Sequence, residues 1–276
     1  MIKRIIKMCL PKRAIDILYK FKSRIQNKDD YEWSEYYKQY SKQISEIEKE
    51  NTLILPEGKY SIVEGKIILE QSLLPLHPNH KLLYETIYDL KPSSLLEVGC
   101  GCGDHLANIQ KILHKTKISG CDLLEDQIRF LLSRHPELKA NANLFVHDIT
   151  ISPPNIKVDL VYTQAVIMHI HRNNRRLSAL RNMFHTSKKY IVLMEDWSSH
   201  NFYNDIKKIS KEPDFPWESI YLYVNDDGKQ ILMVISNTIL EGYKELHNNK
   251  ELQKYLKPPQ KKKEETNENS SSTTSL

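Results

Sequence analysis

The stretch LLEVGCGCGDHLANI, Leu95–Ile109, decides how the rest of the chain is interpreted. It opens with the apolar residues of a buried strand and closes with a helical pattern, and three glycines alternate with two cysteines between them. Glycine has no Cβ, so such a loop turns tightly and lets a ligand approach the backbone. The N–H groups at the start of the following helix then face that ligand. The stretch therefore predicts a strand, a ligand-binding loop and a helix in succession.

The two cysteines of this loop, Cys100 and Cys102, indicate neither a zinc site nor a redox pair. A structural zinc site takes four ligands, usually from two separated pairs, and no second pair follows downstream. Redox cysteines more often have two residues between them. The chain has four cysteines in 276 residues, which favours a reducing, cytoplasmic setting. We therefore expect no metal at these cysteines, although the candidate residues His77, His80, Glu195, Asp196 and His200 could bind either a substrate or a metal.

Strand-length apolar runs alternate with helix-length amphipathic segments between residues 80 and 236. This alternation predicts a parallel sheet with helices on both faces. Only residues 225–230 separate the last two strands, too few for a helical crossover, so these strands form an antiparallel hairpin. The predicted strands are residues 94–99, 117–122, 143–147, 158–163, 189–194, 219–224 and 231–235.

Acidic residues follow the two strands after the glycine loop. Asp122 ends the first of these strands, and Asp148 follows the next. Ligands of such sheets bind at the carboxyl ends of the strands, where these residues meet. A carboxylate at Asp122 suits the two hydroxyls of a ribose, and one at Asp148 suits the exocyclic amine of an adenine. The loop and the two acids together predict an adenosine-containing ligand.

The run EVGCGCG, Glu97–Gly103, followed by Asp122 and Asp148, resembles the class I S-adenosylmethionine-dependent methyltransferase family. The resemblance covers about residues 80–236. It implies a Rossmann-like α/β fold with a seven-stranded, mostly parallel sheet and a C-terminal antiparallel hairpin, preceded by a helical N-terminal extension. It also implies S-adenosylmethionine as cofactor, with its methionine part on Glu97 and the glycine loop. The implied cofactor-binding residues are Glu97, Gly99, Cys100, Gly101, Gly103, Asp122, Leu123, His147, Asp148 and Gln164.

Two histidines in the segment TQAVIMHIHRNNRR, His169 and His171, are candidate catalytic bases. The protein mainly has to align the acceptor and exclude water, because the cofactor brings the reactivity. An alcohol acceptor also needs a base, for which histidine suits pH 7. The family often has a V-L-x-H-I pattern here, which His169 matches. The alternative that both histidines are structural stays open.

The acceptor is predicted to be an oxygen. The tetrad [N/D]PP[Y/F] after the fourth strand, typical of amino-group methylation in the family, is missing. Segments such as LLPLHPNHKLLYE and VLMEDWSSHNF resemble bacterial methyltransferases of cell-surface polysaccharide clusters, including those for capsules. That resemblance implies a sugar, sugar nucleotide or glycan-linked acceptor. The candidate acceptor-binding residues, each of which is otherwise an ordinary loop or packing residue, are His77, His80, Tyr37, Glu195, Asp196 and His200.

The net charge of +5 is concentrated at the N-terminus. Residues 1–28 carry nine Lys and Arg against one acid, Asp16, so the rest of the chain is slightly acidic. Nucleic-acid enzymes more often spread basic charge over their main surface, so we expect no nucleic-acid partner. A basic amphipathic helix at residues 1–28 either contacts an anionic membrane surface, placing the protein at its cytoplasmic face, or packs on protein.

The sequence divides into five segments. Residues 29–79 are predicted to form an extension that caps the active site, with two short strands around the turns at Glu57-Gly58 and Glu64-Gly65. Two alternatives remain: an RNA or protein methyltransferase, and a non-catalytic binding module that keeps the fold. The predicted segments are the basic segment 1–28, the cap 29–79, the methyltransferase domain 80–240, a C-terminal helix 241–256 and a disordered tail 257–276.

Overall fold

A computed structural model describes residue 33 and residues 42–171, 174–197, 199–227 and 230–256. The predicted N-terminal amphipathic helix, Tyr37 and the predicted tail lie outside these residues. Within them, no helix combines the length and the apolar character needed to cross a membrane.

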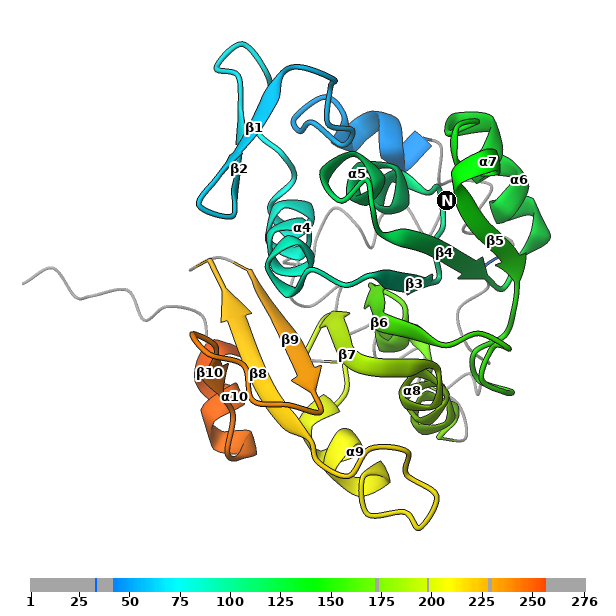
Figure 1. Cartoon of the computed structure of the whole chain (residues 1–276), viewed down its shortest axis with the longest axis vertical. Coiled ribbons are helices and arrows are strands. Elements are labelled where there is room, and N and C mark those ends of the chain that lie inside the picture. The colour runs from blue at the N-terminus through cyan, green and yellow to red at the C-terminus, as the bar shows by residue number, and fades with distance from the viewer. Residues whose placement is uncertain (1–32, 34–41, 172–173, 198, 228–229, 257–276) are drawn as a thin grey trace, which may run out of the picture.

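An eight-stranded sheet runs through the molecule in the order β10-β8-β9-β7-β6-β3-β4-β5 (Figure 1). Strands β3 to β7 are parallel, whereas β9 lies antiparallel between β7 and β8. The predicted Rossmann-like fold and its closing antiparallel hairpin are therefore confirmed. The strands are β3 (Ser94–Val98), β4 (Lys117–Asp122), β5 (Ala142–Val146), β6 (Val158–Gln164), β7 (Ser187–Met194), β8 (Tyr221–Asp226), β9 (Ile231–Ser236) and β10 (Lys244–Glu245).

Helices cover both faces of this sheet, as Figure 1 shows. One apolar core joins the sheet to α4, α5, α6 and α7, and a second core joins the opposite face to α8, α9 and α10. The helices of the first face are α4 (Pro78–Leu90), α5 (Asp104–Ile112), α6 (Glu125–Arg134) and α7 (Leu138–Asn141). Those of the second face are α8 (Arg175–Thr186), α9 (Phe202–Ile209) and α10 (Asn249–Leu256).

The central strand β6 explains why the sheet strands read as continuous apolar runs. Its residues alternate between the cores, with Val161 in one and Leu160 and Tyr162 in the other. A strand covered by helices on both faces has no solvent side, so polar residues do not alternate with apolar ones. The sequence pattern of these strands therefore follows from their central position.

The N-terminal extension contributes a hairpin of β1 (Tyr60–Val63) and β2 (Lys66–Leu69). Its turn residues Glu64 and Gly65 both have positive φ, 49° and 77°, as a two-residue hairpin turn requires. The Ile67 N–H donates to Glu85 of α4 over 2.8 Å. The two predicted strands are confirmed, but the hairpin packs beside the domain on α4 and does not line the cavity described below.

The C-terminal region differs from the prediction in two ways. Residues 241–256 do not form one helix, because α10 begins only at Asn249. Before it, β10 pairs antiparallel with the edge strand β8 and gives the sheet an eighth strand, where seven were predicted. A two-residue strand has too few positions to show an alternating pattern, so it could not be predicted from the sequence.

Candidate active site

The loop between β3 and α5 depends on glycine for its conformation and its packing. Gly99, Gly101 and Gly103 have φ values of 74°, 48° and 81°, which L side chains rarely adopt. A Cβ on Gly99 would lie 2.5 Å from Val166 Cγ2, and one on Gly103 would lie 2.4 Å from Leu131 Cγ. Gly103, predicted to bind the cofactor, does not line the cavity. Its missing side chain instead makes room for Leu131.

A cavity of about 370 Å³ opens at the carboxyl ends of β3 to β6. Its volume lies within the range of small-molecule sites, about 300 to 1,000 Å³. The structure brings most of the predicted cofactor residues together there. The predicted residues that line it are Glu97, Gly99, Cys100, Gly101, Asp122, Leu123, His147, Asp148, Gln164 and His169.

Glu97 reaches this cavity from β3 with an unpaired carboxyl oxygen. Its side chain is buried, and its Oε2 atom has no hydrogen-bond partner among the described residues. Burial raises the pKa of Glu97 well above its ordinary value, against a smaller opposing effect of the neighbouring Tyr162 hydroxyl. A buried acceptor without a donor costs about 1 to 3 kcal/mol. Such an atom beside a cavity indicates that a ligand supplies the missing donor.

Asp122 holds the glycine loop from the end of β4. Its Oδ2 atom accepts the Gly101 N–H over 3.0 Å, and its Oδ1 atom accepts the Leu124 N–H over 3.1 Å. Burial raises the pKa of Asp122, while these backbone hydrogen bonds oppose that shift. A carboxylate accepts about four hydrogen bonds. Both oxygens can therefore also accept hydroxyls of a ligand.

Asp148 is held at the end of the next strand. It accepts the N–H and the hydroxyl of Thr150 over 2.8 and 2.6 Å, and it pairs with Arg175 over 2.8 Å. Its neighbour His147 contacts the Ser152 carbonyl through Nε2 over 2.7 Å. This side of the cavity is thus ordered by contacts within the protein.

His169 lies at the end of a short 3₁₀ helix, Ile167–His169, that follows β6. Burial lowers its pKa, and His171 lowers it further, while Asp196 has the opposite effect. The imidazole is therefore neutral at pH 7 and able to accept a proton. The Trp33 ring meets the His169 ring edge to face at 5.3 Å between centroids. His171, the other candidate base, is exposed and does not line the cavity.

Glu195, predicted to bind the acceptor, is committed to the turn that carries His169. Its carboxylate accepts the Thr163 hydroxyl over 2.7 Å and the N–H groups of residues 166–168 over 3.0 to 3.2 Å. It is buried and does not line the cavity. These contacts make Glu195 a structural residue that holds the turn carrying His169.

The other candidate acceptor residues form two histidine contacts outside the cavity. The His80 ring lies 4.7 Å from His77, and the His200 ring lies 5.0 Å from His171. These residues and Asp196 do not line the cavity. Across the described ranges, no group of three or more His, Cys, Asp or Glu is arranged to hold a metal ion.

The cavity residues that were not predicted from the sequence include Trp33, His105 and Arg175. His105 stands in the glycine-loop stretch itself, in the first turn of α5. The helix register that turns its ring toward the cavity could have indicated it. Trp33 belongs to a stretch rich in aromatic residues, residues 31–40, which suits either a ligand contact or packing on the core. Nothing in the local pattern marks Arg175.

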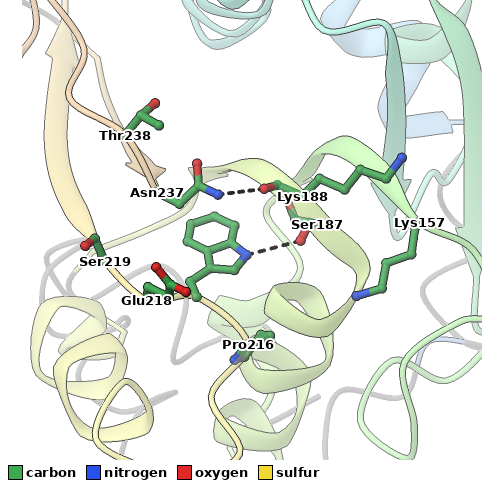
Figure 2. Close-up of a pocket in the computed structure, with 9 residues that line it drawn as sticks. Lys157, Ser187, Lys188, Pro216, Glu218, Ser219, Asn237 and Thr238 are labelled. Carbon is green, nitrogen blue, oxygen red and sulfur yellow. Dashed lines mark hydrogen bonds between the residues drawn. The ribbon is translucent and has the colours of Figure 1, made fainter.

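A second hollow, of about 600 Å³, lies on the side of the sheet where the parallel strands begin (Figure 2). Its wall includes Lys157, Ser187 and Lys188 near the amino ends of β6 and β7. The polar groups there bond within the protein: Trp217 Nε1 donates to the Ser187 carbonyl, and Asn237 donates to the Lys188 carbonyl. No predicted site residue lines it, and ligands of such sheets bind at the carboxyl edge.

Comparisons with known proteins relate part of the chain to one family model. Residues 95–189 match the family model described as a methyltransferase domain. No curated protein matches the chain.

Solved structures with a similar arrangement include the plantazolicin methyltransferase BpumL with a desmethylPZN analogue and SAH, 17% identical over 57% of this chain and 84% of that one, TM-score 0.43. The N-methyltransferase NodS from Bradyrhizobium japonicum WM9 with SAH is 15% identical over 58% and 86%, TM-score 0.44. Magnesium protoporphyrin IX methyltransferase from Synechocystis PCC 6803 with bound SAM is 12% identical over 58% and 80%, TM-score 0.42.

Proposed function

We propose that the chain is an S-adenosylmethionine-dependent methyltransferase that methylates an oxygen of a sugar, sugar nucleotide or glycan-linked group. The observation that carries the cofactor assignment is the convergence of Glu97, Asp122 and Asp148 on one cavity at the carboxyl edge of the sheet. The methyltransferase-domain match over residues 95–189 supports it independently.

The residues of the cavity fit the parts of this cofactor. The unpaired Oε2 of Glu97 suits its ammonium group, and Asp122 has lone pairs left for two ribose hydroxyls. Leu123, which is 46% exposed, offers an apolar surface to the adenine, beside the carboxylate of Asp148. The bound cofactor supplies a sulfonium methyl for in-line displacement. The chain itself has to hold the acceptor and exclude water.

His169 is the residue that best suits the role of base. It lines the cavity, its ring is neutral at pH 7, and Glu195 fixes the turn that carries it. A neutral imidazole can take the proton of an acceptor hydroxyl as the oxygen gains the methyl group. The Trp33 ring beside it gives the acceptor an apolar surface.

The preference for a glycan acceptor rests on sequence. The amino-methylation tetrad is missing, and the basic residues of segment 1–28 suit work beside an anionic membrane surface. The slightly acidic remainder suits a small or glycan acceptor better than a nucleic acid. We therefore place the protein in the cytoplasm, at the membrane face where glycans are assembled.

A pair of histidine variants tests the base. We expect His169→Asn to lower kcat about 10²- to 10⁴-fold, as loss of a general base does, without changing the Kd of S-adenosylmethionine. The matched control is His171→Asn, which changes an exposed histidine two residues away. The measurement is methyl transfer to sugar and sugar-nucleotide acceptors. Equal loss in both variants would contradict the role of His169.

A further inference from the structure

Three histidines stand in a row from the cavity wall to the start of α4. His105 lines the cavity, its ring lies 4.4 Å from that of His80, and His80 lies 4.7 Å from His77. The Nδ1 atom of each is buried and has no hydrogen-bond partner among the described residues. Buried polar atoms are paired in the great majority of cases. Three unpaired nitrogens in one cluster, none of which the proposed function uses, therefore indicate a binding site.

His105 stands at the same end of the cavity as Glu97. The Tyr84 ring lies 5.7 Å from the His105 ring, and Tyr84 also interacts electrostatically with Glu97. Gln164 is a hydrogen-bonding neighbour of His105 and lies on β6 two residues beyond Tyr162. Tyr162 is the register partner of Glu97. Residues two apart in a strand share a face, so Gln164 and Glu97 place His105 on this side of the sheet.

Among the described residues, the charges of the cavity lining leave this end without a permanent cation. The described lining includes the acids Glu97, Asp122 and Asp148 but no lysine, and its one arginine is Arg175. Arg175 pairs with Asp148 over 2.8 Å, at the other end. An anionic group bound beside Glu97 must therefore find another donor. His105 is the ionisable donor of the lining there.

We propose that His105, with His80 packed behind it, binds the α-carboxylate of the cofactor's amino-acid part while Glu97 binds the ammonium. This inference rests on the proposed function, because the carboxylate belongs to S-adenosylmethionine. Burial lowers the pKa of His105 to about 4, against a smaller opposing effect of Asp104. The imidazole of the empty cavity is thus neutral at pH 7, and it donates one N–H.

Truncation of the ligand isolates this contact. S-Adenosylhomocysteine and 5′-methylthioadenosine share the adenosine and the thioether, but only the first has the ammonium and the carboxylate. A hydrogen bond to a charged group is worth about 1.5 to 3 kcal/mol. We therefore expect His105→Leu to weaken S-adenosylhomocysteine about 10- to 100-fold and to change the Kd of 5′-methylthioadenosine less than threefold. The measurement is calorimetric titration of each variant with both ligands.

Two control variants separate the contact from a general effect on the fold. His105→Asn keeps a donor and should recover most of the affinity for S-adenosylhomocysteine. His147→Asn alters a cavity histidine at the adenine end, so it should shift both ligands by the same factor. The proposal is overturned if His105→Leu shifts both ligands equally or shifts neither.

The design also covers a variant that fails to fold. If His105→Leu does not fold, the affinities of His105→Gln and His105→Glu for S-adenosylhomocysteine are compared instead. The carboxylate of the second variant should repel the carboxylate of S-adenosylhomocysteine, so this variant should bind it more weakly. Equal affinities in that pair would overturn the proposal. Wild-type protein that binds neither ligand would contradict the proposed function itself, which keeps the two failures distinguishable.

Discussion

The two ends of the cavity differ in how the protein satisfies their polar side chains. At the adenosine end, Asp122 accepts two backbone N–H groups, and Asp148 is bonded to Thr150 and Arg175. At the amino-acid end, Glu97 Oε2 and His105 Nδ1 have no partner among the described residues. The first end is ordered by contacts within the protein, whereas the second keeps buried polar atoms without a partner among the described residues.

This difference has a thermodynamic consequence. A paired carboxylate stabilises the empty protein, whereas an unpaired buried one destabilises it until a ligand arrives. Substitutions at the adenosine end should therefore cost both stability and binding. Substitutions at the amino-acid end should cost binding and increase stability, the trade-off found at functional sites.

The largest effect is expected for Asp122→Ala. The ligand loses two charge-assisted hydrogen bonds, each worth about 1.5 to 3 kcal/mol, so the Kd of S-adenosylmethionine should rise at least about 100-fold. The N–H groups of Gly101 and Leu124 also lose their acceptor, so urea unfolding should show a loss of about 2 kcal/mol. Asp126→Ala, at an exposed residue of α6, is the control. If Asp122→Ala left the affinity for S-adenosylmethionine unchanged, Asp122 would not hold the cofactor. That result would favour the alternative of a non-catalytic binding module.

A smaller effect is expected for Asp148→Ala. One ligand hydrogen bond is lost, which corresponds to about a tenfold rise in Kd. Stability should fall by about 1 kcal/mol, because Thr150 and Arg175 lose a partly exposed partner. Arg175→Met should lower stability by less and leave binding nearly unchanged. Calorimetry and urea unfolding on the same samples measure both quantities.

Glu97→Met should increase stability and at the same time weaken cofactor binding. It removes the unpaired oxygen from a buried position, so the free energy of unfolding should rise by about 1 kcal/mol at pH 8. The Kd of S-adenosylmethionine should rise about tenfold, since the ammonium loses its acceptor. Glu70→Met, at an exposed position, is the matched control. A loss of stability in Glu97→Met would show that the two ends of the cavity do not differ.

The pH dependence of unfolding gives the finest distinction. The pKa of Glu97 is raised in the folded protein, so the folded state holds a proton that the unfolded state releases above the ordinary carboxyl pKa. Wild-type stability should therefore fall relative to Glu97→Met as pH rises from about 4.5 towards the raised pKa. A constant difference between the two proteins over this range would contradict the burial of Glu97 as an unpaired acid.

The regular alternation of strands and helices could be predicted from the sequence. The strand ends differ from the prediction by one or two residues, because central parallel strands give long apolar runs. The strand β10 and the split of residues 241–256 were missed, since a two-residue strand is stabilised by its neighbour β8 and not by its own pattern.

The candidate site was predictable where motif and strand end coincide. Glu97, Asp122 and Asp148 follow directly from the order of strands and line the cavity. Side-chain direction was not predictable, so Glu195 was taken for an acceptor residue although it folds back onto the turn at residues 166–168. His105 was not predicted, although it stands in the first turn of α5, whose register turns its ring toward the cavity.

Calorimetric titration of the folded wild-type protein with S-adenosylmethionine and S-adenosylhomocysteine tests the central claim most directly. We expect both to bind with Kd values on the order of micromolar, which would justify screening sugar and sugar-nucleotide acceptors for methyl transfer. Absence of binding by either ligand in a folded sample would contradict the methyltransferase function and leave the cavity to another ligand.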